Sequence, residues 1–432
     1  MKTDPELEVF ASKNGGQSSV QKDEIFKAKE GKGKICIEKG SINESVINLC
    51  IISFGIGLLA LPQKVNYVTL LMIPFLIIIC GAINYWTFVV LADASRKYKK
   101  NKYEDIVSVM FNPYFSYFFI IVMIIGLLGI MILFQVILYK FIGGIYNIRL
   151  IVCYSISIFI LFPLCLIKTI SKMRYFTSFG VFSVFLIIFI VVIQCPNFFY
   201  HNVIEGKQEI NLNNFSVGFD KDLKFIQSIS TIIFAFECHA GIFPAIAELN
   251  DPTPLRVNTV FKRAATINVI SYIIITVAGY LSQPENTPDL VLEREKISKN
   301  DYLMTLGLFL FSITLTTKIS ASFNCLRALF LNLLKYDLNN YPNHINYIIT
   351  SIILGLTTFT AAIFQNISDY ISLISSFYGL FISVIMPGII YIKGNQFPLT
   401  HYKNILAILF IVSLCFIGII TFYFTLKRIF KF

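Results

Sequence analysis

The sequence is short of charge. Only 14% of its 432 residues are Asp, Glu, Lys or Arg, whereas 56% are hydrophobic and the mean hydropathy is +0.71. A soluble core of this size could not hide so much apolar surface, which excludes a soluble globular protein. The composition instead predicts an all-α polytopic membrane protein embedded in a lipid bilayer, with one transmembrane domain over residues 41–432.

Histidine is rare, and cysteines outside the apolar runs are few. There are four histidines, and nearly all of the nine cysteines fall within apolar segments. This excludes an external disulfide framework, and no Cys/His spacing suits a structural metal. The ionisable residues inside the apolar runs form no catalytic triad. We therefore expect no enzyme activity, no metal and no cofactor.

The N-terminal region lacks the apolar stretch of a cleaved signal peptide. Residues 1–40 are polar and Lys-rich, without apolar periodicity, and we expect a disordered cytoplasmic tail. The net charge of +11 would suit a nucleic-acid partner, but the Lys and Arg residues stand in short segments between apolar runs. That distribution is the one that orients helices in a bilayer, so we expect no nucleic-acid binding.

Hydropathy predicts about eleven membrane spans, each near the ~20 residues that a bilayer requires. They lie near residues 43–66, 68–94, 115–143, 148–168, 174–196, 222–248, 264–283, 302–333, 345–365, 369–392 and 402–426.

Basic residues predict the orientation of these spans. The tail and the second, fourth and sixth connections are rich in Lys and Arg and fall on one side of the membrane, which places the N-terminus in the cytoplasm. Lys427, Arg428 and Lys431 disagree, because with eleven spans they end on the opposite side. Either the last span is misplaced or the early helices determine the orientation. We favour the second explanation, because eleven spans fit the symmetry of two interrupted helices described next.

The segment from Phe234 to Leu249 interrupts the sixth span. Glu237 and His239 fall near the middle of the bilayer, where a charged group costs at least ~3 kcal/mol and usually faces a cavity or a substrate path. Gly241 and Pro244 weaken the helix at the same depth, which is tolerated where the freed backbone groups line a polar site. This pattern predicts half of a binding site built from broken helices.

A second interruption lies in the first span, between Asn48 and Pro62. Gly55 and Gly57 allow the backbone to unwind, and about five spans separate this break from that in the sixth span. Transporters made of inverted repeats have this spacing and hold substrate between open helix ends. The alternative is that the two glycines only allow neighbouring helices to pack closely.

The two segments also resemble those of a known family. The motif from Gly55 to Pro62, GIGLLALP, is similar to the first-helix motif of the amino acid/auxin permease family. The segment FAFECHAGIFPAIAEL, from Phe234 to Leu249, resembles the sixth helix of that family, particularly in its sodium-coupled neutral amino-acid transporters and vacuolar amino-acid transporters. The resemblance implies eleven helices in a five-plus-five inverted repeat (LeuT-like), with helices 1 and 6 broken, that moves amino acids.

The resemblance also implies the substrate-binding positions. They are Ser53, Phe54, Gly55, Ile56 and Gly57 in the first segment, and Phe236, Glu237, Cys238, His239, Ala240 and Gly241 in the second. An open helix N-terminus offers N–H donors to a substrate carboxylate, which makes this assignment physically reasonable. Glu237 would either favour cationic amino acids or carry a proton, and His239 is either a ligand or a hydrogen-bonded packing residue.

Lys318, in the eighth span, is the second ionisable residue near mid-bilayer. Aligned with sodium-coupled relatives, it falls where they place a threonine of the sodium site, and Ile51 falls where they place an asparagine. Both departures remove oxygen ligands, and an ammonium repels sodium. The sequence therefore predicts transport without sodium. Lys318 would act in coupling or gating, by loading and releasing a proton, or would form a static pair with Glu237. The third alternative is that it lies nearer an interface, with its ammonium extended to the water.

The expected function is thus a secondary active or facilitative transporter of neutral or cationic amino acids, sodium-independent and either coupled to protons or not. The alternative is an amino-acid sensor that signals through its cytoplasmic tail. The membrane is either the plasma membrane or that of an acidic, vacuole-like organelle. The sequence leaves the oligomeric state and the direction of flux open.

Overall fold

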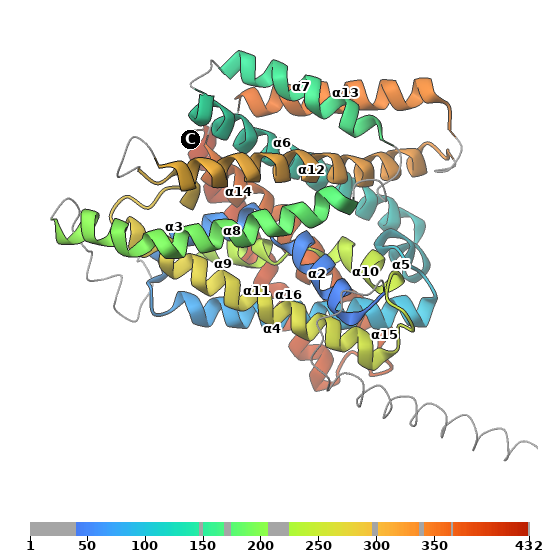
Figure 1. Ribbon diagram of the computed structural model, residues 1–432. Helices are drawn as coiled ribbons and strands as arrows, with labels where there is room; N and C mark the ends of the chain where they lie inside the picture. The colour runs from blue at the N-terminus through green and yellow to red at the C-terminus, as the bar shows by residue number, and fades with distance from the viewer. Residues whose placement is uncertain are drawn as a thin grey trace, which may run out of the picture.

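The computed structural model describes residues 40–146, 150–167, 174–205, 224–295, 301–336, 341–363 and 366–430, and every regular element in these ranges is helical (Figure 1). The predicted tail therefore lies outside the described residues, except for Gly40. Two short helices precede the long ones near the start of the chain. These are α2 (Ile42–Ser53) and α3 (Ile56–Val68).

Nine helical stretches in the described ranges are long and apolar enough to cross a membrane, and α2 and α3 together add a tenth. The long single helices are α4 (Ile73–Tyr98), α6 (Pro113–Tyr146), α8 (Arg174–Phe199), α11 (Pro254–Ser282), α12 (Tyr302–Leu333), α13 (Asn343–Ile363) and α16 (Tyr402–Phe430). The 17-residue helix α7 (Leu150–Leu166) is at the lower limit for a span and stands where the fourth span was predicted. Each of the eleven predicted spans thus corresponds to a helical segment.

Two further spans are composite. The sixth consists of α9 (Lys224–Ala235), a 3-10 turn η4 (His239–Gly241) and α10 (Ile242–Ala247). The tenth runs through α14 (Ile367–Ile374), the π-helical segments η6 (Ser375–Gly379) and η7 (Phe381–Ile385), and α15 (Met386–Gly394). The predicted breaks in the first and sixth spans are both present, and the axis turns by 57° between α2 and α3.

Local sequence explains where two elements differ from the hydropathy prediction. Helix α11 begins ten residues before the predicted span because the Thr253 hydroxyl accepts the Arg256 N–H and Pro254 occupies the first turn. The connecting helix α5 (Tyr103–Met110) was not predicted. Its buried residues, Tyr103, Ile106, Val107 and Met110, recur at helical spacing, but the helix is too short for a span.

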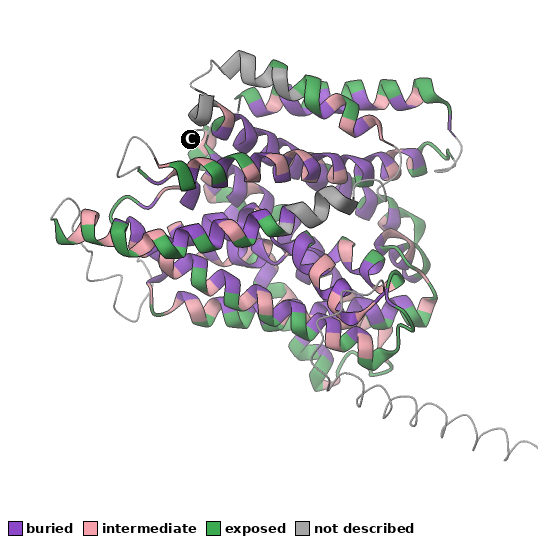
Figure 2. Cartoon of the chain, in the orientation of Figure 1, coloured by how far each residue is buried: buried purple, intermediate pink, exposed green. Residues whose placement is uncertain are grey.

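The broken helices lie inside the bundle. Helix α11 packs against α2, α3, α4 and α8, while α12 packs against α6, α7 and α8. Purple, buried residues fill the interior in Figure 2, and large apolar side chains are exposed on the outer helices. Leu406, Leu409 and Phe416 on α16 are examples, as expected for a surface covered by lipid tails.

Candidate functional site

The first break leaves two open helix ends. At the end of α2, the Phe54 N–H and the Ser53 hydroxyl both donate to the Cys50 carbonyl, at 2.8 and 3.1 Å. Phe54 is extended, and α3 starts after Gly55 without a side-chain cap. The first N–H groups of α3, from Ile56 onward, have no partner within their own helix, so this end can receive an anion such as a carboxylate.

Gly57 serves close packing rather than unwinding. A Cβ at this position would lie 2.5 Å from the Ala235 Cα, so the two backbones meet where α3 passes the end of α9. Gly55 is extended and open on one side, where a Cβ would be 3.8 Å from the Lys318 Nζ. The close-packing alternative therefore holds for Gly57. The predicted break between α2 and α3 is present as well.

The second break is a pair of tight turns. Phe236 N–H donates to the Ile233 carbonyl and Glu237 N–H to the Phe234 carbonyl, at 3.1 and 3.0 Å, and α9 ends there. The chain then tightens again, as Gly241 N–H donates to the Cys238 carbonyl at 2.8 Å. Of the six predicted site residues here, Phe236, Cys238 and His239 are buried, Glu237 and Gly241 are partly buried, and Ala240 is exposed.

Lys318 projects from α12 onto the first break. Its ammonium donates to the Ile51 carbonyl at 3.3 Å and to the Phe54 carbonyl. These carbonyls stand one turn apart at the open end of α2, where the helix dipole is negative. Lys318 and Glu237 both lie in the described part of the chain, and no contact within 4 Å joins their charged atoms. Lys318 thus pairs with backbone carbonyls, not with Glu237.

His239 is held from the other side by α4. Its Nε2 lies 2.8 Å from the Thr87 Oγ1, and the Thr87 hydroxyl donates to the Asn84 carbonyl. Among the described residues, neither Nδ1 nor the Asn84 side chain has a hydrogen-bond partner. The contact with Thr87 supports the packing role for His239.

Two residues of α11 reach the breaks and were not singled out in the sequence. Tyr272 lies within hydrogen-bond distance of the Ser53 and Ala235 carbonyls, and Asn268 donates to the Ser53 hydroxyl. The available signal was their spacing. Asn268, Tyr272 and Thr276 form a polar stripe, four residues apart, in an apolar helix.

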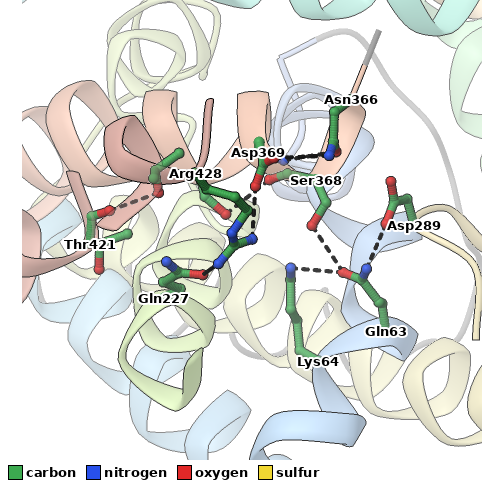
Figure 3. Close-up of polar contacts among 11 residues, drawn as sticks. Gln63, Lys64, Gln227, Asp289, Asn366, Ser368, Asp369, Thr421 and Arg428 are labelled. Carbon is green, nitrogen blue, oxygen red and sulfur yellow. Dashed lines mark hydrogen bonds and ion pairs between the residues drawn. The ribbon is translucent and has the colours of Figure 1, made fainter. Parts of the chain in front are cut away.

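A polar cluster covers one end of the broken helices, and we call it the polar cap (Figure 3). The Gln63 side-chain amide donates a hydrogen bond to Asp289 at 2.5 Å. Its oxygen accepts from Lys64 at 2.9 Å and from Ser368 at 3.3 Å. The cap joins α3, α9, α14, α16 and the connection after α11. Its members are Gln63, Lys64, Gln227, Asp289, Asn366, Ser368, Asp369 and Arg428.

Arg428 explains part of the disagreement over orientation. Its guanidinium donates to Asp369 at 2.8 Å and to Gln227 at 3.0 Å, and Asp369 also accepts from Asn366 at 2.8 Å. This basic residue therefore has a structural role within the protein, which does not depend on which side of the membrane it faces.

Comparison with known proteins gives one family and one fold. A family model described as transmembrane amino acid transporter protein matches residues 38–427. A Plasmodium falciparum protein with the provisional name amino acid transporter AAT1 is 21% identical over 66% of this chain and 46% of its own length. Vacuolar amino acid transporter 7 of Saccharomyces cerevisiae is 30% identical over 29% of this chain and 25% of its own length. The chain thus spans less than half the length of both curated relatives.

A solved structure shares the architecture. The crystal structure of the Eremococcus coleocola manganese transporter matches 89% of this chain and 87% of its own, with a TM-score of 0.57 and 12% identity. This likeness shows the fold alone, and it confirms the LeuT-like, five-plus-five arrangement expected from the sequence. The family and the solved neighbour are transporters rather than enzymes.

Proposed function

This chain belongs to the transmembrane amino acid transporter family, and from that premise we propose that it carries amino acids across a membrane without sodium. The observation that carries the sodium-independent part is the Lys318 ammonium on the Ile51 and Phe54 carbonyls. Two carbonyls one turn apart at an open helix end form a cradle for a cation. In this protein a side chain supplies that cation.

Charge repulsion makes the cradle a poor sodium site. A sodium ion about 4 Å from the ammonium would be repelled by about 4 kcal/mol at the effective dielectric constant of a partly buried site. Sodium also needs several oxygen ligands, and Lys318 takes two carbonyls without adding an oxygen of its own. Lys318 either remains a fixed cation or releases a proton during the cycle, in which case transport is coupled to protons.

The substrate is proposed to lie between the two breaks. Its carboxylate would meet the uncapped start of α3, from Gly55 to Gly57, and the second break, from Phe236 to Gly241, would line the opposite side. The Glu237 carboxylate forms no ion pair with Lys318, so it remains able to attract the ammonium of a cationic side chain. The substrate class is therefore neutral or cationic amino acids.

We place the protein in a vacuolar membrane, with its N-terminus in the cytoplasm. The yeast relative is named a vacuolar amino acid transporter, and the basic connections between spans support the orientation. In this orientation the polar cap faces the lumen.

Uptake into proteoliposomes tests the proposal. Labelled leucine and lysine are offered under an imposed sodium gradient and, separately, under a pH gradient, to the unmodified protein and to Lys318→Thr, Lys318→Arg and Lys140→Thr. Lys140 is the control because it pairs with Glu293, outside the site. Uptake without sodium is expected from the unmodified protein and from the control.

The two lysine variants separate the roles of Lys318. If the residue carries a proton, pH-driven uptake is lost in both, because Arg keeps the charge but does not release a proton. If it is a fixed cation, Arg retains uptake and Thr does not. Stimulation of the unmodified protein by a sodium gradient would overturn the sodium-independent assignment.

A further inference from the structure

Helix α11 touches both breaks along a single stripe. The Asn268 Nδ2 donates to the Ser53 Oγ at 2.8 Å, one turn before Tyr272. The Tyr272 Oη lies 3.0 Å from the Ser53 carbonyl oxygen and 2.6 Å from the Ala235 carbonyl oxygen. One hydroxyl therefore joins the last residue of α2 to the last residue of α9.

The Tyr272 ring packs against one aromatic residue of each break. The side chain is fully buried, and its ring centroid lies 6.0 Å from that of Phe54 and 4.6 Å from that of Phe236. Phe54 follows Ser53, and Phe236 follows Ala235. Both the ring and the hydroxyl of Tyr272 thus contact each break at the residues where its helix ends.

The Tyr272 hydroxyl is a hydrogen-bond donor for carbonyls at two helix ends. The last carbonyls of a helix have no partner within the helix, and within a bilayer no surrounding water replaces one. The Lys318 ammonium donates to the Ile51 and Phe54 carbonyls. The Tyr272 hydroxyl donates to the carbonyls of Ser53 and Ala235. A phenol has a single proton, so the two carbonyls share it, with the shorter distance to Ala235.

We propose that Tyr272 is a positioning residue that holds the open ends of α2 and α9 at a fixed separation. The inference rests on the proposed function, in which substrate binds between the breaks. A substrate that contacts both breaks then binds to a preformed site, because Tyr272 has already set their spacing. Tyr272 does not itself contact the substrate in this proposal.

The alkylation rates of two native cysteines test whether this separation is held, and they require no transport assay. Cys50 lies in the last turn of α2 and Cys238 in the second break, and each is 2% exposed. Alkylation of these thiols by N-ethylmaleimide, mapped by mass spectrometry in native membranes, is compared in unmodified protein, Tyr272→Phe and Tyr280→Phe. Tyr280 is the matched control, since it is a fully buried tyrosine of α11 two turns further on. Cys165, fully buried at the end of α7, is the internal reference.

Loss of the Tyr272 hydroxyl is expected to accelerate alkylation of Cys50 and Cys238 together by at least roughly tenfold, since two buried carbonyls lose their donor. Cys165 should not change, and Tyr280→Phe should leave all three rates within about twofold. Unchanged rates at Cys50 and Cys238 in Tyr272→Phe would overturn the proposal. Equal acceleration at Cys165 would also overturn it, because that result indicates general loosening of the fold.

Asn268→Ala gives a second test that does not depend on the stability of the tyrosine variant. It removes the contact with the Ser53 hydroxyl but leaves Tyr272 in place, so both thiols should stay protected. Exposure of both thiols in Asn268→Ala would identify Asn268 as the residue that holds the breaks and would overturn the role of Tyr272.

Transport kinetics link this positioning role to function. Tyr272→Phe should raise the KM for the substrate by at least roughly tenfold and leave the maximal rate within about twofold, because the site is no longer preformed. A loss of maximal rate with an unchanged KM would contradict this role. If the unmodified protein transports no amino acid, the proposed function fails, and the alkylation result still decides the role of Tyr272.

Discussion

The carbonyl oxygen of Ile51 accepts a hydrogen bond of 3.3 Å from the ammonium of Lys318, which lies 267 positions further along the chain. The contact joins the end of a broken helix to the middle of an unbroken one. It places the Lys318 ammonium at the negative end of α2, beside the first break. The Lys318 ammonium therefore repels any mobile cation or substrate ammonium that approaches the first break.

The close approach of α3 and α9 predicts that Gly57→Ala is destabilising. The new Cβ would lie 2.5 Å from the Ala235 Cα and 2.7 Å from its Cβ, so one half-helix must move. Overpacking of this kind costs about 1–3 kcal/mol and should also reduce uptake, because α3 carries the start of the proposed carboxylate site. Thermal denaturation in detergent and proteoliposome uptake measure the two effects.

Gly355→Ala is the control for that substitution. A Cβ at Gly355 has no heavy atom within 4 Å, so the variant should retain uptake and show an unchanged or slightly higher Tm. If the two alanine variants behave alike, the contact between Gly57 and Ala235 is not what constrains the site.

Glu237→Gln should change selectivity rather than abolish transport. The substitution keeps the shape of the side chain and removes its charge, so uptake of lysine should fall relative to that of leucine by at least roughly tenfold. Competition between the two labelled amino acids gives the ratio directly. Glu248→Gln is the control, because Glu248 is an exposed residue bonded to Asn48 at 3.0 Å. An unchanged ratio in Glu237→Gln would remove Glu237 from the selectivity site.

The sequence predicted the breaks well because their signals are local. A glutamate, a histidine, a glycine and a proline within one apolar run are costly unless the helix is interrupted, and the structure has the interruption there, from Phe236 to Gly241. The helical segments that match the predicted spans were predictable for the same reason, since hydropathy is a property of consecutive residues.

The partners of these segments could not be predicted in the same way. Tyr272 reads as one more aromatic residue in an apolar helix, and its role depends on carbonyls 37 and 219 positions away. The carbonyl partners of Lys318 were likewise hidden, because backbone groups leave no signature in the sequence. In the sequence, Arg428 was only a positive charge on the side of the membrane opposite to the other basic residues. Its ion pair with Asp369 depends on the packing of α16 against α14.

Burial predicts an asymmetry between the two members of the ion pair in the polar cap. The Asp369 side chain is 7% exposed and that of Arg428 is 43% exposed. Arg428→Gln leaves a buried carboxylate without its cation and should lower the Tm clearly, by an amount equivalent to about 1–3 kcal/mol. Asp369→Asn leaves a guanidinium that water can reach and should have the smaller effect. The reverse order of Tm values would contradict this account of the pair.

Glu293, in the segment that follows α11, should stabilise the folded protein more in acid than at neutral pH. Burial raises the pKa of the Glu293 carboxyl above its ordinary value of 4.5, against the opposing effect of the Lys140 hydrogen bond of 2.7 Å. The folded state then binds more protons than the unfolded state as soon as the pH exceeds 4.5, so stability falls as the pH rises from there through the folded-state pKa. The Tm measured across this pH range should fall less in Glu293→Gln than in the unmodified protein. Asp93→Asn, which alters a largely exposed carboxylate, should keep the original slope, and an equal slope in all three proteins would show that Glu293 does not contribute.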